Sequence, residues 1–497
     1  MLFRIIPNCT TKIKSERRQQ YIADQINNCK DLFGTFYTIP FRKGYLVNWE
    51  IERKVWDYVF AQRFRLHRDR DQRYCDTGII FTEPVYNFKS IRENVIELLF
   101  EDYGFGEVLI TTASDLAAYR YFYEENILSD SPKQYGCCVV DSGYSFTHVT
   151  PFLYGHKILQ NTRRINIGGK IISNYLKDIV SYRQLNLLEE THIVNKMKED
   201  CCYISNNVFK DLQICQQKNN LIKLEYVLPD FVTLKNGFVL DRSNPEHVKL
   251  LTPDSQIVNL SNERIQAPEL LFYPSDVNID QAGISDTIVH SISNFRPKND
   301  TKFNGCDDLN HSEQTTRSAL EPPNKIERPS MREIDSDDDE IKGSDEKYEI
   351  PVRRKSSKKS SQLSQKILNQ LETIDLSFIY DENLQAPLLR NILTIGGNCC
   401  FQNFHRRLYT DVRSSIPDIL PININVPDNP VTYAWHGGKL LCKLNKSSQE
   451  CNIVDSNFHQ RSVTKKQYKE LGSTLTGKYF SNMLVPLCVD DDADAEE

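Results

Sequence analysis

Short apolar runs alternate with longer amphipathic stretches along this chain. The runs at 98–110, 136–143 and 390–397 are rich in aliphatic and aromatic side chains and are bounded by glycines, which predicts buried strands. Between such runs, the stretch 189–205 repeats apolar residues at helical spacing and predicts an amphipathic helix. Strands that alternate with helices favour an α/β architecture.

The alternation stops between residues 294 and 372. This segment is dominated by charged and small polar residues, with an acidic run at 335–340 and a basic run at 353–359. Few large apolar side chains remain to offset the entropy lost on ordering, so we predict a disordered insert. The basic run is a candidate nuclear-import signal, with a plain linker as the alternative. A second acidic run, 489–497, closes the sequence.

Composition narrows the choice of partners and compartment. The chain of 497 residues has a net charge of -6, which argues against a whole-protein attraction to nucleic acid and favours basic partners. Its 14 cysteines include no C-x-x-C pair, so they predict neither a zinc site nor a disulfide framework, and a reducing compartment is expected. No apolar segment approaches the roughly 20 residues of a membrane helix.

Two glycine turns are candidates for binding a phosphate or a nucleotide. Asp141, at the end of an apolar run, could orient water around a magnesium ion, and Gly143 would let backbone N–H groups approach phosphate oxygens. Asp-Ser-Gly is also an ordinary hairpin turn. Gly396 and Gly397 separate a predicted strand from a predicted helix that carries Phe401 on its apolar face. The same pair can place a nucleotide at a helix N-terminus or simply form a tight turn.

The remaining candidates are weaker. Lys198 and Glu199 close the predicted helix at 189–205, and a solvated charged face is the alternative reading. No histidine belongs to a recognisable catalytic set, and the G-x-S-x-G, H-E-x-x-H and P-loop motifs do not occur. Residue chemistry alone therefore leaves the function open.

Taken together, several stretches resemble the actin family. The segment 36–60 contains a glycine followed by Asn-Trp-Glu and a helix with a second tryptophan, as in that family. Further matching stretches follow in the family's order: FTEPVYNFKSIREN (81–94), LSNERIQAPELLFYPSD (260–276), YAWHGGKLL (433–441) and VTKKQYKELG (463–472). The resemblance covers nearly the whole chain outside the insert.

The resemblance implies an actin-like fold of the duplicated ribonuclease H type, with two α/β lobes around a nucleotide cleft. The expected outer lobe comprises 1–131 and 433–497, with an accessory subdomain at about 10–39. The expected inner lobe is 132–432, with an accessory subdomain at about 168–283 and the disordered insert 294–372.

The sequences VVDSGYSFTHV and NPVTYAWHGGKLL are similar to the corresponding stretches in a nuclear branch of the family. That branch implies a non-catalytic, architectural subunit of a chromatin-remodelling complex that exchanges a variant histone into nucleosomes. Its partners would be other subunits, including the remodelling ATPase, and histones or nucleosomes. No membrane and no sequence-specific nucleic acid is expected, and the location would be the nucleus, with the cytoplasm as a further site. The alternatives are an active ATP-hydrolysing enzyme and a filament-forming cytoskeletal protein.

The resemblance also defines a vestigial nucleotide site. Lys198, Glu199, Gly396, Gly397 and Phe401 match positions that contact adenosine, and Asp141 and Gly143 match the phosphate hairpin. The hairpin departs from the family, because Tyr144 and Ser145 replace an aspartate and a glycine, and Val431 replaces a lysine beside the base. No glutamine aligns with the residue that positions the attacking water. We therefore expect no required cofactor, with ATP bound weakly or without turnover.

The first residues, MLFRIIPNC, resemble the third strand of the family. Members normally begin with a strand, an Asp-Asn-Gly phosphate loop and a second strand. Loss of a central strand would leave backbone groups unpaired. We therefore expect an incomplete chain, with a shortened variant as the alternative.

Overall fold

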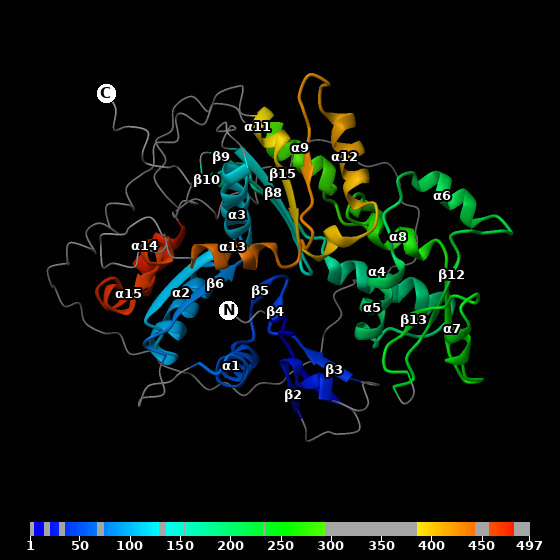
Figure 1. Cartoon of the computed structure of the whole chain (residues 1–497), viewed down its shortest axis with the longest axis horizontal. Coiled ribbons are helices and arrows are strands. Elements are labelled where there is room, and N and C mark those ends of the chain that lie inside the picture. Colours follow the sequence, from blue (N-terminus) through cyan, green and yellow to red (C-terminus); the bar gives the residue numbers. More distant parts are fainter. Residues whose placement is uncertain are drawn as a thin grey trace, which may run out of the picture. The chain divides into compact units, whose positions relative to one another are not determined.

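The computed structural model (Figure 1) describes residues 4–13, 20–28, 35–66, 74–128, 136–153, 155–231, 234–293, 385–442 and 457–481. It is a mixed α/β structure with several separate sheets. The predicted insert at 294–372 and the acidic run at 489–497 lie outside the described residues.

The N-terminal part forms a small antiparallel sheet and a hairpin. Its three strands are ordered β2-β1-β3, with bounds Gln20–Ile22, Thr10–Ile13 and Thr35–Thr38. The hairpin of β4 (Phe41–Arg42) and β5 (Tyr45–Leu46) follows. Helix α1 (Trp49–Tyr58) then begins after Asn48, whose side chain accepts a hydrogen bond from the Ile51 N–H and so caps the helix.

A second sheet has the order β17-β7-β6, with β6 (Gly78–Glu83) parallel to β7 (Glu107–Thr112) and β17 (Val463–Thr464) antiparallel. The associated helices are α2 (Lys89–Glu97), α3 (Ala113–Leu128), α13 (Tyr433–Leu441), α14 (Asn457–Arg461) and α15 (Lys465–Ser481).

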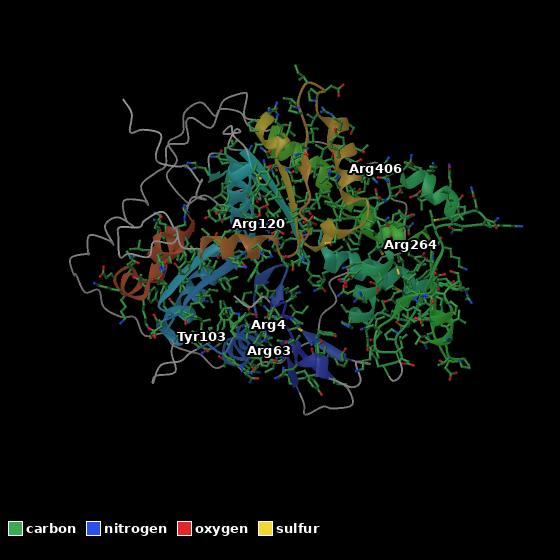
Figure 2. The ribbon with its side chains drawn as sticks, in the orientation of Figure 1. Arg4, Arg63, Tyr103, Arg120, Arg264 and Arg406 are labelled. Carbon is green, nitrogen blue, oxygen red and sulfur yellow. The ribbon has the colours of Figure 1, made fainter. Side chains whose placement is uncertain are left out.

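Helices α3 and α13 pack closely although they are far apart in the sequence (Figure 1). A Cβ at Gly437 would lie 2.0 Å from the Leu116 carbonyl oxygen, so only glycine permits this approach. Arg120, labelled on α3 in Figure 2, places its guanidinium 4.1 Å from the centre of the Tyr433 ring on α13. Helix α13 is thereby fixed on helix α3.

The largest sheet has the order β10-β9-β8-β15-β16, and β11 also pairs with β9. Strands β8 (Gly136–Ser142) and β9 (Thr147–Leu153) form an antiparallel hairpin, and β15 (Ile392–Ile395) runs parallel to β8. The shorter strands are β10 (His156–Lys157), β11 (Arg163–Ile165) and β16 (Ile424–Asn425). Helices α4 (Gly169–Arg183), α9 (Ile284–Ser293), α11 (Gln385–Arg390) and α12 (Phe404–Ser415) contribute to its core.

A further three-stranded antiparallel sheet, β13-β12-β14, lies in the segment between α4 and α9. Its strands are β12 (Leu224–Val227), β13 (Phe238–Val239) and β14 (Ile257–Leu260). The helices of this segment are α5 (Thr191–Cys201), α6 (Val208–Cys215), α7 (Pro245–Lys249) and α8 (Glu263–Glu269). Buried residues of α4, α5 and this sheet join the core of the largest sheet.

The structure confirms three of the four elements predicted from apolar patterning. The runs at 136–143 and 390–397 contain β8 and β15, and the stretch 189–205 contains α5. The prediction of one strand over 98–110 is wrong. Residues Leu98–Asp102 continue α2 as a π-helical turn, and β7 starts only at Glu107. A short apolar run cannot distinguish a buried strand from the buried end of a helix. The proposed lobe boundaries stay a prediction.

Candidate functional site

The end of strand β8 brings together three of the candidate residues. Asp141 pairs with Ile395 of β15 in parallel register, so the glycines that follow β15 lie beside the turn that follows β8. Gly396 has a φ of 97°, and a Cβ there would stand 2.2 Å from the Ser142 carbonyl oxygen. Only glycine fits this conformation and this contact. Asp141, Gly143 and Gly396 therefore meet at one edge of the largest sheet.

The turn after β8 is folded onto the first residues of α4. The Gly169 N–H donates to the Gly143 carbonyl at 3.0 Å, and the Lys170 N–H donates to the Tyr144 carbonyl at 2.8 Å. Gly168 is in close contact with the turn, since a Cβ there would lie 2.5 Å from the Tyr144 carbonyl oxygen. Free N–H groups at a helix N-terminus are a common phosphate site. Here the first two donate to the chain's own carbonyls.

A chain of polar side chains joins the segment after β15 to this turn. The Asn398 side-chain amide donates to the Gly143 carbonyl at 2.8 Å and to the Ser142 hydroxyl at 3.1 Å. The Ser142 and Thr147 hydroxyls are 2.8 Å apart, and Thr147 donates to the Ile167 carbonyl at 2.9 Å. All three side chains are buried. Buried polar groups that satisfy one another fix their elements in a single arrangement.

Lys198, on the last turn of α5, points into the protein. Its ammonium donates to the Ser173 hydroxyl at 3.1 Å and to the Gly169 carbonyl at 3.4 Å, both on α4. The residue is only 6% exposed, so the alternative reading of a solvated face is wrong for Lys198 and holds only for the exposed Glu199. Burial lowers the pKa of the Lys198 ammonium, against the opposing effect of the Glu199 carboxylate.

Gly169 is the point where these groups converge. A Cβ on Gly169 would stand 3.3 Å from the Lys198 Nζ, 3.4 Å from the Asn398 Oδ1 and 3.4 Å from the Tyr144 ring. Burial raises the pKa of the Tyr144 phenol, and a hydrogen bond from Asn195 opposes the rise. The tyrosine that replaces an acid in the hairpin thus lies against the start of α4.

The other side of the site is open. A Cβ at Gly397 would meet nothing within 4 Å, and Gly397, Glu199 and Cys400 are exposed. Partial burial of the thiol, and then the charge of Glu199, raise the pKa of Cys400. Phe401 is half-buried beside these residues. It precedes α12, so its predicted place on the apolar face of that helix is wrong, because the chain turns at Asn403 with a φ of 67°.

A half-buried aspartate and a buried histidine are paired across the β8–β9 hairpin. Burial raises the pKa of Asp141 to about 6. Burial, with the charges of Arg164 and Lys157, lowers the pKa of His148 to about 3. The His148 Nε2 has no hydrogen-bond partner among the described residues. Because all seven residues of β9 are buried, no alternation in the sequence marked this histidine.

The two sides of this site differ in how free their groups are. Gly397 and Glu199 are exposed and Phe401 is half-buried. On the phosphate side, the α4 N–H groups and the Lys198 ammonium already have partners within the chain. No group of three metal-ligating side chains occurs in the part of the chain that the structure describes, and none of its helices is long and apolar enough to cross a membrane.

Comparison with known proteins shows the family to which this chain belongs. The Actin family model matches residues 3–302 and 343–481. The chain belongs to the actin family.

Three of the similar curated proteins are named Actin-related protein 6 or Actin-like protein ARP6. Actin-related protein 6 of Drosophila melanogaster is 32% identical over 475 residues, which cover 94% of this chain and 92% of the relative. Actin-related protein 6 of Arabidopsis thaliana is 26% identical, with 96% of this chain and 93% of the relative covered. Actin-like protein ARP6 of Cryptococcus neoformans is 36% identical over 58% of this chain and 61% of its own length.

Proposed function

We propose that this protein is a non-catalytic, architectural subunit of a nuclear chromatin-remodelling complex that exchanges a variant histone into nucleosomes. The proposal is supported by the similarity to proteins named Actin-related protein 6 and by the resemblance of the β8–β9 hairpin to a nuclear branch of the family. Its partners would be the remodelling ATPase, other subunits, and histones or nucleosomes.

The observation that carries the non-catalytic part is the closure of the β8–β9 turn onto α4. The Gly143 and Tyr144 carbonyls accept from the first N–H groups of α4, and Lys198 is held by Ser173 and Gly169. A catalyst of phosphoryl transfer needs such donors free to stabilise charge on the transferring group. We infer that ATP is bound weakly or without turnover.

Two experiments test the proposal. Purified protein should hydrolyse ATP no faster than background, and magnesium-dependent turnover that is lost in Asp141→Ala would favour the enzyme reading instead. A tagged full chain, recovered from nuclear extract, should bring down a large assembly with a remodelling ATPase and histones. Contacts that hold a stable subunit are largely apolar at their centre and should survive moderate salt.

Deletion of the acidic run at 489–497 tests whether histones are captured through charge alone. Contacts through charges alone weaken as salt screens them, so its deletion should reduce histone capture while assembly with the ATPase persists. Recovery mainly as a free monomer, as filaments or with cytoplasmic motor proteins would contradict the chromatin role. The filament outcome would favour the cytoskeletal alternative.

A further inference from the structure

Strand β11 and helix α9 line a small, partly open cavity of about 230 Å³. Its polar lining consists of Arg163 and Arg164 of β11, Gln281 of the preceding loop, and Thr287 and His290 of α9. No carboxylate lines it. The lining residues thus include two arginines and one histidine and no acid. Successive residues of a strand project to opposite faces, so only one of the two guanidinium groups faces the cavity.

The two arginines are held by neutral groups. Arg163 donates through one nitrogen to the Gln160 and Thr162 carbonyls, at 2.6 and 2.9 Å. Arg164 donates to the Asn166 Oδ1 at 3.0 Å, and to the Tyr45 hydroxyl and the Lys43 carbonyl, both at 2.7 Å.

Neither arginine forms an ion pair with a described residue, although both are half-buried. Arg92 and Arg407, which are also largely removed from water, each face a glutamate. Because a partly desolvated charge without a counter-charge is unfavourable, an arginine without an ion pair in the lining of a cavity favours an anion that arrives from outside.

The cavity retains unused donors. A guanidinium has five N–H groups, and no described hydrogen bond uses the Nε and the second terminal nitrogen of Arg163. The Gln281 Oε1 accepts from the Asn166 N–H at 2.8 Å, which leaves the amide nitrogen of Gln281 as a donor. His290 is exposed at the mouth of the cavity. This donor set complements the two acceptor oxygens of a carboxylate.

The volume restricts the ligand. Pockets for drug-sized ligands and cofactors occupy roughly 300–1,000 Å³, so a cavity of about 230 Å³ is small for a nucleotide and suits a single side chain. We propose that this cavity is a docking site for an acidic side chain of a partner protein. The choice of a protein partner rests on the proposed role as a subunit of an assembly.

A direct binding measurement tests the site without the assembly. The probe is a fluorescein-labelled peptide, Gly-Ser-Glu-Asp-Glu-Glu-Asp-Ser, titrated with the full chain at low salt and followed by anisotropy. Its control has glutamine and asparagine in place of the acids. We expect saturable binding of the acidic peptide only, weakened at least about 10-fold in the double variant Arg163→Gln, His290→Gln, since hydrogen bonds to charged groups are among the stronger ones.

Arg406→Gln is the matched control variant, because Arg406 is exposed on α12 (Figure 2) and lines no part of the cavity. It should bind the peptide as the unchanged protein does. Arg164 is left in place, because its contacts with Tyr45 and Lys43 make its replacement a structural change. If the double variant does not fold, His290→Gln alone, at the exposed mouth, should still weaken binding measurably.

Three results would overturn the assignment: equal binding of the amide peptide, equal loss in Arg406→Gln, or displacement of the peptide by inorganic phosphate at peptide-like concentrations. Binding that appears only after removal of residues 489–497 would assign the cavity to the chain's own acidic end instead of a partner. Failure of the nuclear-extract experiment alone would count against the proposed function and leave peptide binding unaffected.

Discussion

His148 stands directly opposite Asp141 in the antiparallel β8–β9 pair; the histidine is buried and the aspartate is half-buried. Directly paired residues in antiparallel strands project to the same face of the sheet. Desolvation acts on them in opposite directions, because it favours the neutral form of each. It raises the pKa of the acid and lowers the pKa of the imidazole.

Asp141 and His148 are predicted to make opposing contributions to the pH dependence of the free energy of unfolding in mild acid. Between about pH 6.5 and pH 3 the unfolded chain protonates the histidine while folded His148 stays neutral, so its contribution falls as the pH falls. Complete loss of the His148 contribution to the free energy of unfolding corresponds to on the order of 5 kcal/mol. Between about pH 6 and its ordinary value, Asp141 is protonated only in the folded state, so its contribution rises as the pH falls.

Urea unfolding between about pH 4 and pH 7 separates the two. His148→Gln should remove most of the destabilisation on acidification, whereas Asp141→Asn should make it steeper. Identical pH profiles for the two variants would show that neither group titrates as its burial implies.

The contact of Gly168 with the hairpin turn predicts a large difference between two glycine substitutions. Gly168 has an extended backbone that any residue can adopt, so the cost of Gly168→Ala is steric: the new methyl group would stand 2.5 Å from the Tyr144 carbonyl oxygen. We expect a loss of about 2–3 kcal/mol in the free energy of unfolding. Gly397→Ala, which meets nothing within 4 Å, should change it by less than about 0.5 kcal/mol. Equal effects on the urea midpoint would contradict the closed turn.

Much of the framework of this site follows from sequence pattern. The continuous apolar runs of β8 and β15 mark strands that lie side by side in the middle of a sheet, where both faces are covered. The glycines at 396 and 397 follow such a run and therefore fall at the sheet edge where the turn at Gly143 also lies. Because β8 and β15 run parallel and are paired, the turns that follow them meet at the same edge of the sheet, and the sequence pattern is enough to predict this.

The direction of Lys198 could not be predicted in the same way. The sequence shows only a charged pair at a helix end, and the partner that receives the ammonium, Ser173, belongs to the preceding helix. Asn398 is similar, because its role depends on the distant Ser142 and Gly143. Polar contacts between elements depend on tertiary packing, which a local pattern does not encode.

The burial of Lys198 predicts that two neighbouring charged residues differ in importance. Lys198→Ala removes the donor for the Ser173 hydroxyl and the Gly169 carbonyl, and should lower the free energy of unfolding by about 1–3 kcal/mol. Glu199→Ala, on the exposed side of the same helix end, should change it by less than about 0.5 kcal/mol. Thermal and urea unfolding of the two variants provide the comparison, and a larger effect at Glu199 would place the ammonium outside.

Arg406 and Arg407 offer the sharpest comparison on α12, because they are adjacent and differ in burial. The Arg407 guanidinium lies 2.8 Å from the Glu269 carboxylate and 2.9 Å from that of Asp411, and it donates to the Ser205 carbonyl at 2.7 Å. Arg406 is exposed.

Arg407→Met would leave the buried Glu269 without its counter-charge, which typically costs about 3–5 kcal/mol. Arg406→Met should cost less than about 0.5 kcal/mol. Adding Glu269→Gln to Arg407→Met removes the uncompensated charge, so the double variant should regain part of the lost stability in urea unfolding. A double variant that is less stable than Arg407→Met would mean that Glu269 stabilises the fold through contacts other than this pair, and the cost would then have to be assigned to the Ser205 carbonyl and Asp411.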